Sequence, residues 1–454
     1  MATVSQARNL LAVLMLVRAA VAVSGTTWYV NGLTGSDTKS CRSATAACRT
    51  IGHAISLAAS GDSVRIAAAT YAEHLAIGTS LELIGAAASS TIIDGTSTGR
   101  VITIPNAASV VTLSNVSIRN GLPLPLNAFA TYGGGVLNEG TLTINSSTVS
   151  GNDAFARVSA YGGGISNFGA LTVNNSTVSG NSAGCGTLTC NAGGGGINNG
   201  RGTVAINNST IAGNVVRAHI GSAFYSQGGG IDNAGVLWIS NSTISGNGAA
   251  SGGGIYGSAH LQNTIVAGSC HGAVSSIFSL SSDSSCNLNG PGDLNNVDPK
   301  LGTLGNYGGA TQTIPLLSGS PAIDAGNPSG CTDANGHLLT TDQRGLRRPD
   351  KEDTGGCDMG AYESQSDYLA ATPAHSTSRN AEALVSTLAG AKPSTSNAAQ
   401  QSCGLGARCS ATHRCCVGLC GTEYKCCDLP YVGQYCTLSV QCCYGSCINH
   451  RCGG

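Results

Sequence analysis

Apolar and polar residues alternate in short segments along most of the first 290 residues of the chain. Segments such as LELIG at 81–85 and VITI at 101–104 are followed by Gly, Asn, Ser or Asp, which favour turns. A period of two predicts β-strands with one buried face. One helical pattern precedes most of them, at about 50–59, and its apolar face is formed by Ile51, Ala54, Ile55 and Ala58.

A glycine-rich phrase is repeated within the strand region, as in GGGISNFGALTVNNSTVSGN at 162–181. Each full copy has an aliphatic residue after the glycines, an Asn two positions later, two strand patterns and a closing Gly-Asn. The copies begin at Gly133, Gly162, Gly194, Gly228 and Gly252, spaced 29, 32, 34 and 24 residues apart. In the first four copies the internal Asn is Asn138, Asn167, Asn199 and Asn233. Self-similarity at this period indicates stacked supersecondary units.

The repeat predicts an all-β fold, a parallel β-helix. Two or three short strands without a helix can bury a small inward face only by stacking each unit on the one before. Alternate side chains then point into the cylinder. Glycine serves corners that need positive φ, and Asn tolerates the same conformation while its amide can bond the Asn one coil away. A leucine-rich solenoid or a propeller would show other spacings.

Two resemblances support this fold. The repeats are similar to the right-handed parallel β-helix of the pectin-lyase-like superfamily, and the helix followed by GDSVRIAAATYAEHLAI resembles its N-terminal cap. The sequence from 298 to 327, with TDQRGLRRP at 341–349 and CDMGAYE at 357–363, resembles the C-terminal signature of the choice-of-anchor Q family. The resemblance implies a β-helix with its cap at 25–297 and a region at 298–363 that covers the open last coil.

Composition limits the possible partners. The chain has 454 residues, of which 10% are charged and 4% aromatic, and its formal net charge is −1. A conventional core of large aromatic side chains is therefore not expected. Binding to nucleic acid depends on clustered Lys and Arg, so no nucleic-acid partner is expected. The oligomeric state stays open.

The N-terminus has the features of a secretory signal peptide, predicted at 1–24. Arg8 precedes an apolar run at 10–17, and Ala20-Val21-Ala22 has the form that signal peptidase accepts. The apolar run ends at Arg18, far short of the roughly 20 residues that a transmembrane helix needs. We therefore expect a secreted, extracellular or cell-surface protein without a transmembrane segment.

Twenty cysteines fit an oxidised, exported protein. Eight form sequence-local couples, namely Cys41 with Cys48, Cys185 with Cys190, Cys270 with Cys286, and Cys331 with Cys357. Twelve lie in a tail behind a Ser-, Thr- and Ala-rich linker at 364–401: Cys403, Cys409, Cys415, Cys416, Cys420 and Cys426 at 402–426, then Cys427, Cys436, Cys442, Cys443, Cys447 and Cys452 at 427–454. The spacing lacks zinc-type C-x2-C pairs, so disulfides are expected and no metal. Each half resembles a knottin, and six cysteines permit 15 pairings.

Three variable segments, at 153–161, 182–192 and 215–227, separate the closing Gly-Asn of one copy from the glycines of the next. Insertions that recur at one position of a solenoid line one face, which is often the binding face. We therefore predict a candidate binding face that collects Asp153, Arg157, Tyr161, Arg217, His219 and Tyr225. The tyrosines could stack on sugar rings or cover an Ile of the next coil, and Arg217 with His219 could be a solvated loop pair.

Seven N-x-S/T sequons are possible N-glycosylation sites, at Asn115, Asn145, Asn174, Asn175, Asn207, Asn208 and Asn241. Six of them belong to the repeated phrase, where coil geometry also explains Asn and Thr. Both explanations stay open.

Three functions are compatible with the sequence. The first is a carbohydrate-binding or adhesive protein whose tail attaches it to a cell wall or matrix. The second is a polysaccharide lyase or glycoside hydrolase, and the third is an effector that acts through its knottin-like modules. No cofactor is expected, except Ca²⁺ for a lyase. No catalytic residue can be assigned, because acids such as Asp94, Glu139 and Asp232 are isolated, and fold does not carry function.

Overall fold

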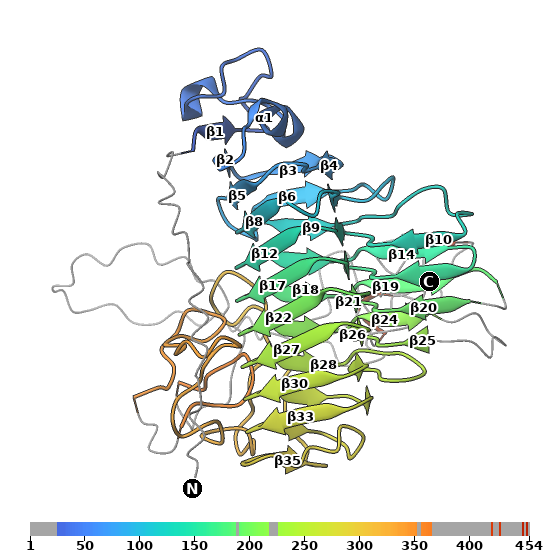
Figure 1. Ribbon diagram of the computed structural model, residues 1–454, viewed down its shortest axis with the longest axis vertical. Coiled ribbons are helices and arrows are strands. Elements are labelled where there is room, and N and C mark those ends of the chain that lie inside the picture. Colours follow the sequence, from blue (N-terminus) through green and yellow to red (C-terminus); the bar gives the residue numbers. More distant parts are fainter. Residues whose placement is uncertain are drawn as a thin grey trace, which may run out of the picture. The chain divides into compact units, whose positions relative to one another are not determined.

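Parallel strands stacked in register form the body of the protein (Figure 1). The computed structural model describes residues 25–187, 190–217, 226–351 and 356–365, together with two short strand pairs in the tail. The chain divides into two compact units, Met1–Ser376 and Thr377–Gly454. Among the described residues no helix is long and apolar enough to cross a membrane.

Three long sheets make the wall of a right-handed parallel β-helix, as the repeat predicts. Sheet A contains β1 (Thr27–Val30), β2 (Asp62–Ile66), β5 (Leu81–Gly85), β8 (Val110–Ser114), β12 (Thr141–Asn145), β17 (Ala170–Asn174), β22 (Thr203–Asn207), β27 (Val236–Ser240), β30 (Ala259–Gln262) and β33 (Val274–Ile277). Sheet B contains β3 (Ala69–Ala72), β6 (Thr91–Asp94), β9 (Ser117–Arg119), β13 (Thr148–Ser150), β18 (Thr177–Ser179), β23 (Thr210–Ala212), β28 (Thr243–Ser245), β31 (Ile265–Ala267), β34 (Leu280–Ser281) and β35 (Leu294–Asn295). Sheet C contains β4 (Leu75–Ala76), β7 (Ile102–Ile104), β11 (Val136–Asn138), β16 (Ile165–Asn167), β21 (Ile197–Asn199), β26 (Ile231–Asn233), β29 (Ile255–Tyr256) and β32 (Cys270–His271).

The interior consists of rows of aliphatic side chains. In sheet A, Leu142, Leu171, Val204 and Leu237 occupy one register position on successive strands, and all are buried. Buried asparagines extend these rows at the corners. Asn138 Nδ2 donates to Asn167 Oδ1 at 2.7 Å, and Asn167 Nδ2 donates to Asn199 Oδ1 at 2.9 Å. The ladder of amides one coil apart, predicted from the repeat, is therefore present.

A short N-terminal helix covers the first coil. Helix α1 (Ile51–Leu57) is preceded by Thr50, whose side chain caps it by accepting a bond from the His53 amide. The Glu73 carboxylate accepts bonds from the amides of Ile51 and Gly52, both at 2.8 Å. These contacts satisfy backbone donors that a helix leaves free at its first turn. A single 3-10 turn, η1 (Ala44–Ala46), precedes it.

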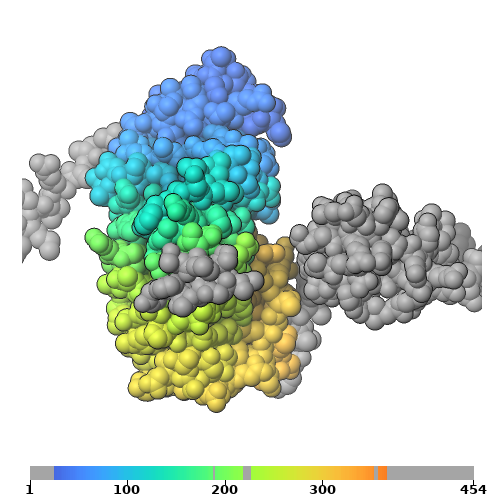
Figure 2. Space-filling view, turned by 90° about the vertical axis from the view of Figure 1, so that its right-hand side faces the viewer, coloured from blue at the N-terminus to red at the C-terminus, as the bar shows by residue number. Residues whose placement is uncertain are grey.

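The described residues of the variable segments between the copies form further stacked strands, where we expected loops. Sheet D contains β10 (Ala130–Tyr132), β15 (Ser159–Tyr161), β20 (Asn191–Gly193) and β25 (Ser226–Gln227), and sheet E contains β14 (Asp153–Ala156), β19 (Ser182–Cys185) and β24 (Val215–Arg217). We call these two sheets the arm. Figure 1 shows it at the side of the solenoid, and Figure 2 views the molecule from that side. Small buried side chains fill its interior, namely Ala154, Ala156, Ala160, Ala183, Ala192 and Val216. Small buried and outward side chains alternate within each segment, which explains why the segments form strands. The alternation was not recognised in the sequence because the segments differ in length.

Residues 298–363, the clasp segment, do not simply cover the last coil as predicted. The segment runs back along the outer side of sheet B (Figures 1 and 2), and its hydrogen bonds reach coils from Asn175 to Asn263. Thr177 Oγ1 donates to the Gln312 carbonyl, and Thr210 Oγ1 donates to Gln343 Oε1 at 2.6 Å. Polar side chains on the outer face of sheet B form these bonds. Within the described residues, the open last coil of the solenoid has no such row of outward polar side chains on successive strands.

The four sequence-local cysteine couples are disulfides in the structure: Cys41–Cys48, Cys185–Cys190, Cys270–Cys286 and Cys331–Cys357. In the tail, β36 (Leu419–Cys420) pairs antiparallel with β37 (Cys426–Cys427), and β38 (Cys447–Ile448) with β39 (Arg451–Cys452). The rest of the tail, the linker and the signal peptide predicted at 1–24 lie outside the described residues.

Candidate functional site

The arm separates the residues that the sequence placed on one binding face. Asp153 and Arg217 lie on the outward side of sheet E, where Arg217 Nη1 is 3.9 Å from Asp153 Oδ2. Tyr161 lies on the outward side of sheet D, with the alanine interior between the two sheets. Arg157 is exposed at the turn from β14 to β15. His219 and Tyr225 lie outside the described residues.

The electrostatic attraction between Asp153 and Arg217 is weak. Burial raises the pKa of Asp153, while the Ser182 hydroxyl and the Arg217 guanidinium oppose that rise. The Arg217 side chain is 69% exposed, so water screens the pair. Asp153 and Arg217 therefore form a weak surface ion pair. The sequence paired Arg217 with His219 instead, and that pair stays a prediction because His219 lies outside the described residues.

A second group of side chains gathers where sheet D meets sheet C. Outward positions of sheet C stand in register on successive coils, namely Thr103, Leu137, Ser166, Asn198, Asp232, Tyr256 and His271. Sheet D contributes a second row, namely Tyr132, Tyr161, Gly193 and Gln227. We call these two rows the corner. The sequence missed it because the residue between the aliphatic and the Asn of each phrase was taken for scaffold.

Three consecutive glycines join each sheet D strand to the next sheet C strand and bring the two rows together. At the middle position of the second copy, a Cβ on Gly163 would collide with the carbonyl oxygens of Ser182 and Gly195. The first glycine, Gly162, has a φ of 69°, in the left-handed region that favours glycine. The glycine run is therefore a requirement of the corner and not a ligand motif.

Asp232 is the single acid in the two rows of the corner, and it is 9% exposed. Asn198 Nδ2 donates to Asp232 Oδ2 at 3.3 Å, and Ser166 Oγ donates to Asn198 Oδ1 at 3.2 Å. Burial raises the pKa of Asp232 to about 6, and the bond from Asn198 opposes the rise. The carboxyl group of Asp232 therefore changes from mostly protonated to mostly ionised at about pH 6.

Tyr161 and Gly193 border this carboxyl group. Burial raises the pKa of Tyr161, and the charges of Asp232 and Tyr132 add to the rise. A Cβ on Gly193 would collide with Asp232 Oδ2 and would lie 3.3 Å from a ring carbon of Tyr161. Because Gly193 takes the register position that a tyrosine occupies on the two preceding strands, it leaves space for the carboxylate.

Aromatic rings continue the corner on both sides of Asp232. The rings of Tyr132 and Tyr161 are stacked with centroids 5.6 Å apart, and Phe168 meets Tyr132 edge-on at 5.4 Å. On the other side, Tyr256 and His271 are stacked at 4.8 Å with an interplanar angle of 6°. With a strand spacing of about 4.8 Å, the five steps from Tyr132 to His271 span roughly 24 Å.

Arg100 is the basic group at the start of the corner. Its Nε donates to the carbonyls of Tyr132 and Gly133 at 3.1 and 2.9 Å, and Nη1 donates to Thr103 at 3.3 Å. Burial lowers its pKa, and Glu139 opposes this. The guanidinium is thus committed to holding the first strand of the arm.

A metal centre is not supported by the described residues. Among the described residues, one group of three potential metal ligands converges, namely Cys41, Cys48 and His53. Both cysteines belong to a disulfide. Their sulfur atoms cannot act as thiolate ligands. The three converging acids that a Ca²⁺-dependent lyase would need do not occur there either.

The sequon asparagines take part in the coil geometry. Asn208 Nδ2 donates to Asn175 Oδ1 at 2.7 Å, and both residues, like Asn115 and Asn241, have positive φ. Asn145, Asn174 and Asn207 form a second ladder with bonds of 3.0 Å. A glycan on any of these donor amides would replace a hydrogen bond of the fold, and glycosylation stays a prediction.

Comparison with solved structures gives weak, fold-level similarities. Pectate lyase Pel9A is 15% identical with a TM-score of 0.37, covering 74% of this chain and 96% of its own. Pectin methylesterase PemA from Erwinia chrysanthemi is 16% identical with a TM-score of 0.31, covering 58% and 80%. The pectin methylesterase from Aspergillus niger is 14% identical with a TM-score of 0.30, covering 60% and 87%. No protein-family model matches the sequence, and no curated protein matches it.

Proposed function

We propose that this is an exported protein that binds a polysaccharide chain along the corner. The observation that carries the proposal is the row of accessible aromatic rings on both sides of the Asp232–Asn198 pair. Aromatic faces stack on the apolar faces of sugar rings, while a carboxyl and an amide group accept and donate bonds to hydroxyls. The straight, in-register arrangement suits a linear polymer.

Export is supported by four disulfides, which persist in oxidising compartments. The signal peptide predicted at 1–24 agrees with this. We further propose that the two cysteine-rich modules retain the protein on a cell wall or matrix, as an anchoring tail. No cofactor is required for binding.

A glycan array with the full-length protein tests the proposal. We expect binding to at least one soluble oligosaccharide, with a loss of about tenfold in Tyr161→Ala and Tyr256→Ala, which is about 1.4 kcal/mol. Phe155→Ala on the opposite sheet of the same arm is the matched control and should bind like the native protein. Absence of binding to every glycan, or equal losses in all three variants, would contradict the proposal.

A second candidate is a glycoside hydrolase or lyase with Asp232 as the proton-transfer group, because a pKa of about 6 suits general acid–base catalysis near neutral pH. A hydrolase needs a second carboxyl group about 5–9.5 Å away, and the corner contains no other acid. Ca²⁺ belongs only to the lyase form of this candidate. The enzyme would be favoured over the binding protein by two observations together. The native protein would form product, and Asp232→Asn would abolish product formation while it still binds the oligosaccharide.

The effector function rests on the tail alone, of which two strand pairs are described. Because the corner offers a ligand site independent of the tail, we place polysaccharide binding first.

A further inference from the structure

Asp232 is the one carboxylic acid in the two rows that form the corner. Apart from His271, the other members of these rows are hydroxyl, amide, aliphatic or aromatic residues and one glycine. His271 is the one member able to carry a positive charge, and it lies two strands from Asp232, which is roughly 10 Å. The centre of the corner is therefore negative when the carboxyl group of Asp232 is ionised.

No cation in the described part of the chain neutralises this carboxylate. The pKa of Asp232 responds to burial and to the bond from Asn198, and no positive charge contributes to it. Arg100 lies beside β7, four strands away, where two backbone carbonyls hold its guanidinium. Arg201 is exposed at the turn after β21, and its charge does not act on the carboxyl group of Asp232. An anion that approaches the centre of the corner thus meets an uncompensated negative charge.

The chain of hydrogen bonds at the centre of the corner ends on an acceptor. Ser166 Oγ donates to Asn198 Oδ1, and Asn198 Nδ2 donates to Asp232 Oδ2. Asp232 Oδ1 accepts no bond from the described residues. This oxygen needs a donor, and a sugar hydroxyl group is one. The ionised carboxylate of a uronic acid has only acceptor oxygens, so it cannot replace that hydroxyl group.

A polyuronate carries a carboxylate on each of its sugar units. Wherever such a chain lies along the straight rows of the corner, one of its carboxylates comes close to Asp232, and like charges brought together at a binding surface oppose binding. We propose that Asp232 sets the specificity of the corner, which takes a linear polysaccharide of uncharged sugars and rejects a polyuronate. This inference rests on the proposed function and adds to it the class of polysaccharide.

Pairs of oligosaccharides that share a backbone and differ only in the carboxylate test the proposal. Three such pairs are cellohexaose with a glucuronate hexamer of the same linkage, mannohexaose with a mannuronate hexamer of the same linkage, and methyl-esterified with free hexagalacturonate. Any further neutral glycan that the array identifies is compared with its uronate counterpart in the same way. Calorimetry of the full-length protein at pH 7.5 keeps Asp232 ionised, and EDTA removes divalent cations that would bridge two carboxylates.

We expect at least one neutral member to bind the native protein, and its acidic partner to bind at least about tenfold more weakly. Asp232→Asn removes the charge and should narrow this difference to less than about threefold. Asp153→Asn is the matched control, because Asp153 is an acid on the other sheet of the arm, 3.9 Å from Arg217, and it should keep the native difference. Equal melting temperatures of the variants would exclude unfolding as the cause of a change.

The native protein alone is sufficient to overturn the proposal. If an acidic member binds as tightly as its neutral partner, or more tightly, the corner does not reject polyuronates, although polysaccharide binding itself is upheld. If the native difference persists in Asp232→Asn, this residue does not set the specificity. Binding to none of the paired oligosaccharides and to no glycan of the array would contradict the proposed function, and the specificity proposal with it.

Discussion

The carboxyl group of Asp232 occupies the space that a side chain on residue 193 would need. Gly193→Ala should therefore displace Asp232 and weaken oligosaccharide binding by about tenfold, without altering the left-handed corners elsewhere. Gly186→Ala is the matched control on the same arm, since its Cβ would meet only the Phe155 ring at an ordinary 3.5 Å. Titration calorimetry measures both, and equal affinities of the two variants would contradict this role of Gly193.

Asp232 should make the protein less stable as the pH rises. Its pKa is about 6 in the folded protein and near the ordinary value of 3.8 in the unfolded chain, so the folded protein binds more protons between these values. The free energy of unfolding then falls with rising pH across this window, by up to about 3 kcal/mol at roughly 1.4 kcal/mol per unit. Asp232→Asn should remove this part of the pH dependence in urea titrations at pH 4.5 and 7.5. If the free energy of unfolding changes with pH by the same amount in the native protein and in Asp232→Asn, the expected titration of Asp232 is refuted.

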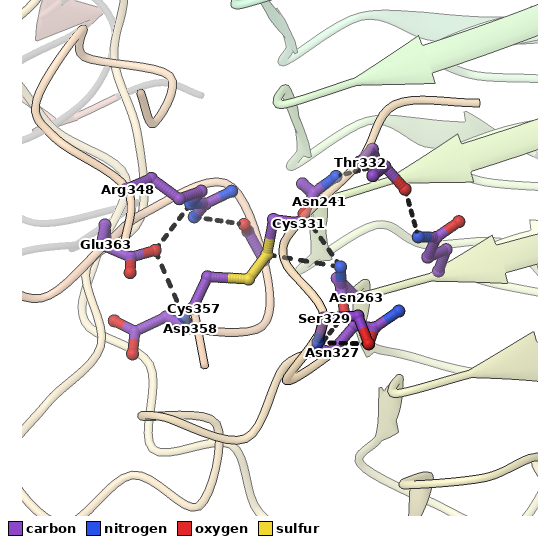
Figure 3. The surroundings of a disulfide bond; sticks show 12 residues. Asn241, Asn263, Asn327, Ser329, Cys331, Thr332, Arg348, Cys357, Asp358 and Glu363 are labelled. Carbon is purple, nitrogen blue, oxygen red and sulfur yellow. Dashed lines mark hydrogen bonds and ion pairs between the residues drawn. A yellow bond between two sulfur atoms is a disulfide. The ribbon is translucent and has the colours of Figure 1, made fainter. Parts of the chain in front are cut away.

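Arg348 should fasten the clasp segment to the solenoid. Its buried Nε donates to Glu363 Oε2 at 2.6 Å, beside the Cys331–Cys357 disulfide (Figure 3). Its Nη1 donates to Asn208 Oδ1 at 3.1 Å. Burial raises the pKa of the neighbouring Asp358, and the charge of Glu363 adds to the rise. Arg348→Met leaves these acids without the guanidinium and should cost about 3–5 kcal/mol.

Limited proteolysis measures the effect on the clasp segment. Cleavage within 298–363 should accelerate strongly in Arg348→Met and stay unchanged in Arg347→Met, whose side chain is exposed. If both variants resist protease like the native protein, the segment is held by its other contacts.

The internal Asn ladder should contribute more stability than the surface ladder. Asn167 is fully buried and takes part in bonds to both Asn138 and Asn199, so Asn167→Ala leaves buried partners unsatisfied and should cost about 2–4 kcal/mol. The half-buried Asn145 accepts one ladder bond from Asn174, and Asn145→Ala should cost about 1 kcal/mol or less. Chemical denaturation gives both values. A larger loss of stability in Asn145→Ala than in Asn167→Ala would show that the buried ladder does not contribute more than the surface ladder.

Local patterns were sufficient to predict much of the fold. The alternation of residues in LTI, LTV, VAI and LWI, with Gly and Asn at the corners, specifies strands, inward rows and amide ladders, because these depend on neighbours at fixed spacing along the chain. The same holds for the four short cysteine couples, whose members are close in sequence. The candidate site was harder to predict, because the sequence placed Tyr161 on a binding face but treated Asp232 as an isolated acid and gave Asn198 and Gly193 no role.

The sequence by itself determined the stacked coils, their glycine and asparagine corners and the low content of charged residues. Only the tertiary structure decided that the arm separates Asp153 from Tyr161, that Gly193 leaves space for Asp232, and that the clasp segment lies along sheet B. The physical reason is that these relationships join residues one or more coils apart. Their partners are set by how coils of unequal length stack, which no local period contains.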